Sequence, residues 1–238
     1  MNPRQLFTAI IVAALLVLSG CNSPVHRDDK DKNKVQFDIK NLAKSDVDSV
    51  LDRVIEFNFT DLRRLMEKLY KRNPREWKKT GVTPEERIAQ IFDGEYEWRF
   101  EELEGKRDIE AMRLSVDPDY PGDRVFALIA GLVSMIYKSY GNRTEIFLLS
   151  EVDPQSIYHS ARNVELVVWL LGKERDARGE LLLYTNSIPG EPLNLSYERL
   201  FGKIIARQDL VAHLLADREN RTIRAVITSF ASLVFFPI

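Results

Sequence analysis

The chain has 238 residues, of which 45% are hydrophobic and 29% are charged, and its formal net charge is −2. This composition supplies enough apolar material for a packed core and excludes a largely disordered protein. The near-neutral charge argues against nucleic acid as a partner, because phosphate binding requires a basic surface.

The first twenty residues are predicted to be an export signal. Arg4 supplies a positive charge, and the mostly apolar stretch that follows, residues 6–18, is 13 residues long. A membrane-spanning helix needs about 20 apolar residues, so this stretch is too short to span a bilayer but fits a signal peptide. The small residues Ser19 and Gly20 come next, directly before Cys21, the only cysteine in the chain.

The four residues 18–21, Leu-Ser-Gly-Cys, resemble the lipobox of bacterial lipoproteins, where the signal peptide is cut before a lipid-carrying cysteine. The resemblance implies that Cys21 carries diacylglycerol on its sulfur and a fatty acid such as palmitate on its amino group. Several acyl chains anchor a protein stably, whereas one alone holds only marginally. The resemblance also implies a place in the cell envelope. In this class of protein, an aspartate directly after the lipidated cysteine favours retention in the inner membrane. This chain has Asn22 at that position, which favours the outer membrane, with the domain facing the periplasm. The alternative is a short membrane anchor that happens to contain a cysteine.

Residues 22–36 are polar and rich in charge, so they are predicted to form a flexible tether after the lipidated cysteine. The remaining residues, 37–238, are expected to form a single all-α domain of several helices. Its sequence does not identify a characterised family.

The helical part begins with apolar residues that recur every three or four positions between 47 and 70. This spacing predicts an amphipathic helix, or two helices if residues 57–61 break it and Thr60 caps the second. The Asn73-Pro74 pair should end this segment, and Thr83 should begin the next helix. Residues 95–100 alternate like a strand, yet we predict a helix there because helical patterns flank them.

Residues 117–123 contain two prolines, a glycine and three aspartates, which predicts a turn, with Asp123 capping the helix after it. A boundary between two halves of the domain is predicted near residues 117–122. Residues 125–137 are apolar almost all round, which predicts a central core helix. The later segments are a buried helix at 153–171, a break at 179–192, an amphipathic helix at 196–220 and an apolar segment at 222–238 that needs burial or a partner.

Signature motifs of hydrolases and nucleotide-binding enzymes are absent from the sequence, so no catalytic residue is predicted. The three histidines lie far apart, and we predict neither a metal nor another cofactor. A glycosidase would need a pair of carboxylates. Five glutamates provide candidates, although a solvated helix face explains them better: Glu95, Glu97, Glu101, Glu102 and Glu104.

Two groups of residues are candidate binding sites. Tyr158, Arg162 and Glu165 share one face of a predicted helix, and they form either a pocket or an internal ion pair with the tyrosine packed on it. Trp77 follows Arg72 and Arg75, and these three residues form either an exposed aromatic and basic patch or a turn whose tryptophan points inward.

The sequence favours a non-enzymatic interaction or structural role at the membrane, in contact with an envelope protein or peptidoglycan. Two alternatives stay open. An envelope hydrolase predicts carboxylates that face one cleft, and a lipid or small-ligand carrier predicts a large apolar cavity. An interaction module predicts an exposed apolar patch.

Overall fold

The computed structural model describes residues 46–94, 97–143, 152–186, 190–192, 194–218, 223 and 234–238. Every regular element in these ranges is a helix, apart from one isolated bridge between Arg175 and Leu181, so the all-α prediction is confirmed. The chain divides into two units, of which the second, residues 42–238, is compact and the first, residues 1–41, lies outside the described residues. The predicted signal, Cys21 and the tether lie outside the described residues. The second unit contains every described helix as well as the turn at 117–122.

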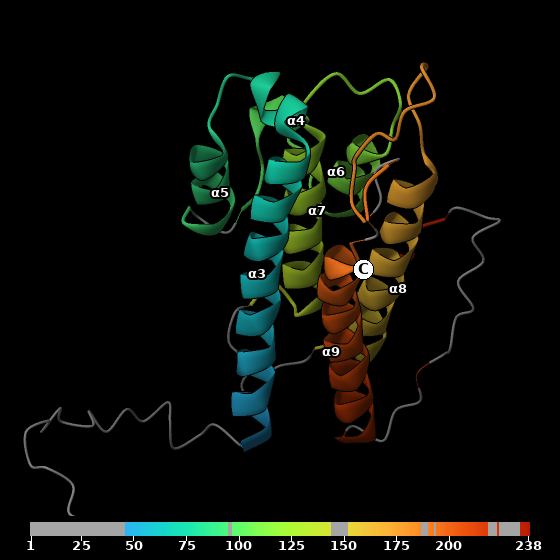
Figure 1. Ribbon diagram of the computed structural model, residues 1–238. Coiled ribbons are helices and arrows are strands. Elements are labelled where there is room, and N and C mark those ends of the chain that lie inside the picture. Colours follow the sequence, from blue (N-terminus) through green and yellow to red (C-terminus); the bar gives the residue numbers. More distant parts are fainter. Residues whose placement is uncertain are drawn as a thin grey trace, which may run out of the picture. The chain divides into compact units, whose positions relative to one another are not determined.

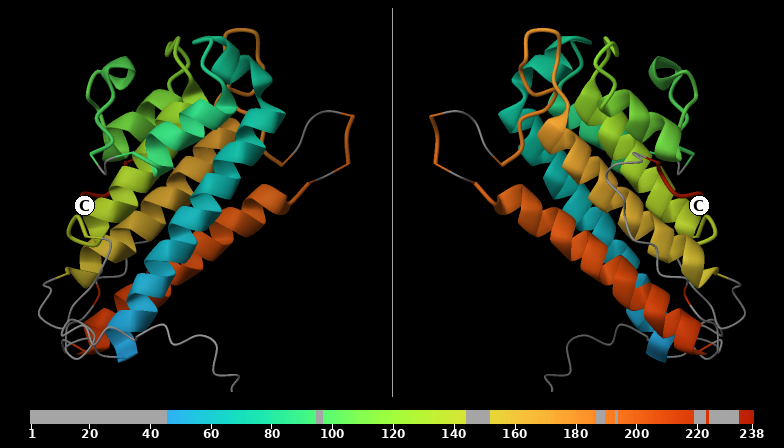
Figure 2. Two further views of the ribbon diagram at one scale, coloured as in Figure 1. Left: turned by 90° about the vertical axis from the view of Figure 1, so that its left-hand side faces the viewer. Right: turned by 90° about the vertical axis from the view of Figure 1, so that its right-hand side faces the viewer.

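Four long helices of the second unit pack around a common core (Figures 1 and 2). They are α3 (Asp46–Arg72), α7 (Arg124–Ser139), α8 (Pro154–Lys173) and α9 (Ser196–Arg218). Helix α3 packs against α7 and α9, and α8 packs against the same two helices. Asn58 hydrogen-bonds to Gln208 and Lys68 to Ser196, so residue numbers rise along α3 as they fall along α9, and the two helices are antiparallel. The short elements are α4 (Pro74–Lys78), α5 (Pro84–Phe92), η1 (Glu101–Leu103) and α6 (Asp108–Ser115).

Helix α7 is the buried centre of the unit, which confirms the prediction for residues 125–137. Helix α6 packs closely across it at Gly131. A Cβ atom at Gly131 would lie 2.6 Å from the backbone nitrogen of Met112 and 2.8 Å from the carbonyl oxygen of Asp108. Glycine is therefore required here, because it lets the backbones of α6 and α7 approach each other.

Helix α3 runs without a break, so the alternative that residues 57–61 interrupt it is wrong. Asn58 is fully buried, and its amide nitrogen donates to the Gln208 oxygen at 3.0 Å. The Asp61 carboxylate accepts from Arg207 at 2.7 Å. Both polar side chains thus bind α9 and not the backbone of α3, which leaves the helix intact.

The predicted start of α5 and the predicted end of the first helix are confirmed. Helix α3 ends before the Asn73-Pro74 pair, and α5 begins at Pro84. The Thr83 hydroxyl accepts from the Glu86 backbone N–H, while the Glu86 carboxylate accepts from the Thr83 N–H. This reciprocal pair satisfies two N–H groups that a helix start leaves without helical partners.

The helix predicted at 95–100 is wrong for residues 97–100, which are irregular; Glu95 and Tyr96 lie outside the described residues. Trp98 has a φ of 48° and is buried. Its indole Nε1–H donates to the Ile91 carbonyl at 2.9 Å, and its ring meets Tyr137 edge-on at 5.0 Å. A single buried tryptophan therefore fixes this loop to the core, and its left-handed backbone is incompatible with a helix.

The later helices also confirm the prediction. Asp153 caps α8, and α9 ends at Arg218, close to the predicted limit. The described residues from 179 to 192 contain no helix. Most of the apolar segment 222–238 lies outside the described residues, but its last five, 234–238, are placed on the surface of α8.

Candidate functional site

The structure brings Tyr158, Arg162 and Glu165 together on α8 and adds Asp209 from α9. The Arg162 Nη2 atom lies 2.7 Å from an Asp209 carboxylate oxygen and 3.1 Å from a Glu165 oxygen. Its guanidinium carbon sits 4.8 Å from the centroid of the Tyr158 ring. Arg162 is thus largely engaged by other residues of the domain, which agrees with the internal ion pair considered from the sequence.

A shallow, open groove continues from this ion pair along α8 and α9. It encloses about 530 Å³, and Val168, Trp169 and Ile205 give it an apolar floor. Glu165, Lys173 and Glu198 form its polar edges, and the Lys173 ammonium group lies 4.5 Å from the centroid of the Trp169 ring. The groove is open to solvent, whereas a lipid carrier would need an enclosed cavity.

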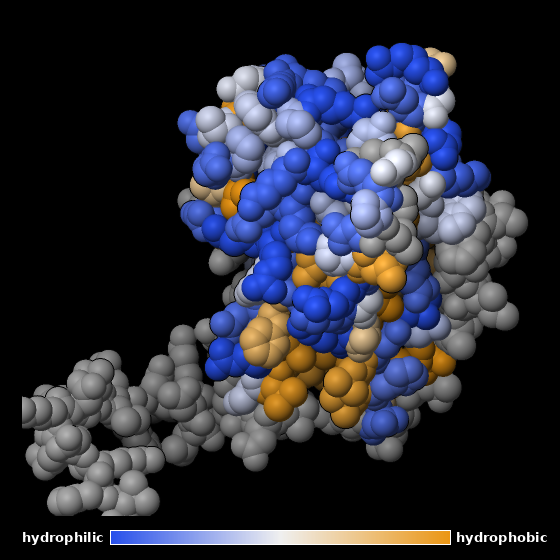
Figure 3. Space-filling model, viewed as in Figure 1, coloured by the Kyte–Doolittle hydropathy of each residue, from blue (hydrophilic) through white to orange (hydrophobic). Residues whose placement is uncertain are grey.

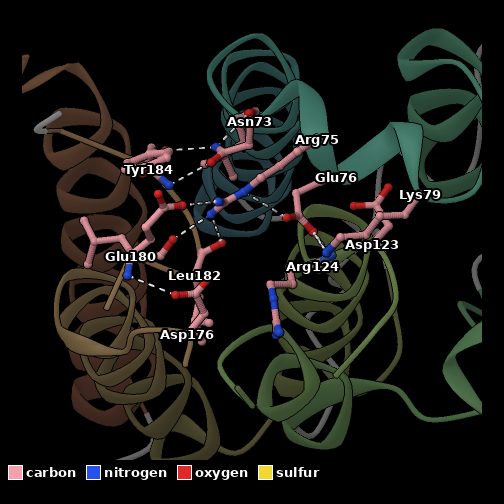
Figure 4. Close-up of polar contacts among 12 residues, drawn as sticks. Asn73, Arg75, Glu76, Lys79, Asp123, Arg124, Asp176, Glu180, Leu182 and Tyr184 are labelled. Carbon is pink, nitrogen blue, oxygen red and sulfur yellow. Dashed lines mark hydrogen bonds and ion pairs between the residues drawn. The ribbon is translucent and has the colours of Figure 1, made fainter. Parts of the chain in front are cut away.

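Helix α4, which contains Trp77, and Asn73 before it are largely engaged within the domain (Figure 4). Arg75 Nη2 donates to the carbonyl oxygens of Leu181 and Leu182 at 2.6 and 2.9 Å. The Asn73 side chain accepts from the Tyr184 N–H at 2.7 Å and donates to the Tyr184 carbonyl at 2.9 Å. Arg72 pairs with Glu191 at 2.7 Å, and Trp77 is half-buried against the core. The basic side chains predicted for a binding patch therefore hold the segment after α8.

Two buried carboxylates serve the N-terminus of α7 (Figure 4). Asp123 accepts from the Phe126 N–H at 3.0 Å, and Glu76 accepts from the Arg124 N–H at 2.9 Å. Lys79 pairs with Glu76 at 2.6 Å. The first N–H groups of a helix have no helical partner, and a negative charge is favourable at that end. Both carboxylates are therefore buried because they satisfy the first N–H groups of α7, a helix that is itself buried on almost all sides.

Asp123 also accepts from the hydroxyl of Tyr70 at 2.8 Å. Burial raises the pKa of Asp123 above its ordinary value, although the Phe126 N–H and the Tyr70 hydroxyl act in the opposite direction. Burial also raises the pKa of Tyr70, and Asp123 adds to that effect. Nearby, burial raises the pKa of Tyr120 to about 12.

The raised pKa of Asp123 predicts a pH dependence of stability. The folded state binds this proton more tightly than the unfolded state, so the contribution of Asp123 to the free energy of unfolding falls as pH rises above about 4. The substitution Asp123→Asn removes this contribution but keeps an equivalent helix cap. In urea unfolding from pH 4 to 8, the variant should gain stability relative to the wild type as pH rises. A difference that stays constant across this range would contradict the prediction.

The glutamates considered for a glycosidase do not line one cleft in the described part of the chain. Glu97, Glu101, Glu102 and Glu104 are exposed, and Glu95 lies outside that part. Arg87 holds both oxygens of Glu102, and Lys106 pairs with Glu104. Within the described ranges, no group of histidine, cysteine, aspartate and glutamate is arranged to hold a metal ion.

An exposed apolar surface lies on α3 and α9 (Figure 3). We call it the α3–α9 face and define it by Val50 and Phe57 of α3 and Leu210 and Leu214 of α9, which are 40–54% exposed. The Arg207 guanidinium joins the two helices across this face, 5.5 Å from the centroid of the Phe57 ring and 2.7 Å from an Asp61 oxygen. Single exposed apolar residues are common, but neighbouring ones on two packed helices form a surface suited to a partner.

The search for relatives gave no match: no protein-family model, curated protein or solved structure is similar to this chain. Of the helices that the structure describes, none has the length and apolar content needed to cross a membrane.

Sequence reasoning missed several buried polar residues, among them Asn58, Gln208 and Asn163. The first two occupy positions of the apolar stripes of α3 and α9, in step with Leu51, Ile55 and Leu62 and with Ile204 and Val211. A polar residue within such a stripe is the signal that would have identified them.

Proposed function

We propose that this chain is a lipid-anchored, non-enzymatic lipoprotein of the bacterial cell envelope, facing the periplasm from the outer membrane. Its helical domain binds a protein partner in the envelope. The lipobox at residues 18–21 supports the anchor.

The observation that carries the binding role is the α3–α9 face. Its apolar residues are flanked by charged ones, including the exposed pair of Arg53 with Glu56. An apolar centre with a polar rim is the usual composition of a protein interface, and it fits a protein better than a polysaccharide. The open α8–α9 groove and the separated glutamates give less support to a carrier or a hydrolase.

The anchor is tested by growing cells with radiolabelled palmitate. We expect the wild type to incorporate the label and Cys21→Ala to lose it. Incorporation that persists in Cys21→Ala would exclude lipidation at this residue.

The binding role is tested by placing a photo-crosslinking amino acid at Phe57 or Leu214 in intact cells. Both positions should give one common crosslinked envelope protein, and Leu210→Asp in the same chain should abolish it. The exposed position Arg178, in the loop after α8, serves as the matched control and should not crosslink to that protein. No product at the two test positions, or an equal product at Arg178, would contradict the proposed interface.

A further inference from the structure

The segment Val234–Ile238, Val-Phe-Phe-Pro-Ile, is held to α8 through its backbone. The Asn163 side chain accepts from the Phe236 N–H at 2.7 Å and donates to the Phe236 carbonyl at 2.9 Å. Asn163 is fully buried. One amide side chain thus makes both backbone hydrogen bonds of a residue, as a neighbouring β-strand does when a peptide is added to a sheet edge. This contact selects an extended peptide and not a particular side chain.

Neighbouring side chains contact Phe236 itself and the residues on either side of it. Phe235 is buried, with the Arg113 guanidinium of α6 at 5.1 Å from its ring centroid. The Phe236 ring stacks on His159 at 5.4 Å between centroids. His159 Nδ1 lies 2.9 Å from the Pro237 carbonyl, so this nitrogen carries the proton and donates. Three consecutive residues, 235–237, therefore each have a partner, and we call Asn163, His159 and Arg113 the Asn163 site.

The Asn163 site lies at the edge of the domain and has room beside it. Both views of Figure 2 place the end of the chain, labelled C, away from α9. Val234 and Pro237 are exposed. Next to Phe235 lies an open cavity of about 360 Å³. Its other walls come from α6 and the turn after it and from the end of α8: Arg113, Leu114, Val116, Asp117, Leu170 and Glu174. Among the described residues, Phe235 is therefore buried and lines this cavity, while Val234 and Pro237 on either side of the two phenylalanines are exposed.

We propose that the Asn163 site is a receptor for extended peptides of the type Phe-Phe-Pro, filled by the chain's own Val234–Ile238 and able to take the same segment from a second copy. The second copy is the occupant that the structure supports, because its segment is identical to the one already seated. A segment joined to its own site has an effective concentration on the order of mM, so exchange between copies requires crowding or release of the resident segment. This inference does not depend on the α3–α9 face.

The peptide arm of the test uses the full chain with Phe235→Ser and Phe236→Ser, which should release the segment and leave the site intact. A fluorescent Val-Phe-Phe-Pro-Ile peptide should bind this variant saturably, and at least tenfold more weakly to the wild type, whose own segment competes. A peptide with an N-methyl group on the second phenylalanine cannot donate to Asn163, so its affinity should fall by at least tenfold. Equal binding of the two peptides, or no binding to a variant with wild-type circular dichroism, would overturn the proposal.

The second arm tests exchange between copies. The chain with Asn163→Ala keeps its segment but loses the site, so an equimolar mixture with the Phe235→Ser, Phe236→Ser chain should sediment as a heterodimer. Each chain alone should be a monomer. If Asn163→Ala unfolds the domain, His159→Ala serves in its place, because it removes the ring stack and the Pro237 hydrogen bond from a half-buried position. Peptide binding without a heterodimer would exclude the second copy as the occupant.

Discussion

Replacing Gly131 by valine should lower the free energy of unfolding by about 3 kcal/mol, the upper end of the usual cost of overpacking a core. The new side chain would clash with Met112 and Asp108 of α6, and the two closest backbone atoms belong to a helix that cannot yield locally. The Ser134 hydroxyl, which accepts from the Asp108 N–H at 2.7 Å, reinforces this contact between α6 and α7. Urea unfolding followed by circular dichroism measures the effect.

Gly202 in α9 is the matched control, because a Cβ atom there would meet nothing within 4 Å. Gly202→Ala should stabilise the domain by about 0.5–1 kcal/mol, the helix-propensity difference between the two residues. If Gly131→Val unfolds within about 0.5 kcal/mol of the wild type, the close approach of α6 and α7 is not as described.

Replacing Gln208 by leucine should cost about 4 kcal/mol, because several buried groups lose their partner together. The Gln208 oxygen accepts from the Tyr140 hydroxyl at 2.6 Å and from Asn58 at 3.0 Å. Its amide nitrogen donates to the Ser160 hydroxyl at 2.6 Å. These contacts connect α9 to α3, to α8 and to Tyr140, the residue directly after α7, so one side chain links all four long helices.

Lys203, an exposed residue of α9, is the control for this substitution, and Lys203→Leu should change stability by no more than about 0.5 kcal/mol. The cost of Asn58→Leu and Gln208→Leu together should be smaller than the sum of the single costs, since the second change removes a group that the first leaves unpaired. Strictly additive costs would show that the hydrogen bond between the two side chains contributes nothing.

Most of the helices were predictable from local patterns, because their apolar spacing and end signals agree. Residues 125–137 are apolar almost all round and form the buried α7, and Thr83 with Pro84 marks the start of α5. The predictions fail where a residue far away in the sequence determines the local structure. Nothing near Phe57 in the sequence shows that Gln208 and Arg207 will bind Asn58 and Asp61 and so keep α3 whole.

The candidate sites were predictable only as groups of residues on one helix. The spacing of Tyr158, Arg162 and Glu165 places them on one face, but Asp209 comes from another helix and changes the arrangement into a link between α8 and α9. Arg75 likewise looked available for a ligand, whereas it binds carbonyl groups more than 100 residues further along the chain. Cys21 stays a prediction from its lipobox.

The contacts of Arg75 and Asn73 define a place where a label can be inserted. Both side chains bind backbone groups of residues 181–184, and Arg75 also pairs with the Glu180 side chain at 3.4 Å, so the attachment begins at residue 180. Ala177 and Arg178 form the exposed tip, and Asp176 closes the turn by accepting from the N–H groups of Arg178 and Glu180. An epitope tag between Ala177 and Arg178 would open this turn but leave the contacts of Arg75 and Asn73 with residues 181–184 in place, and would allow the protein to be followed in living cells.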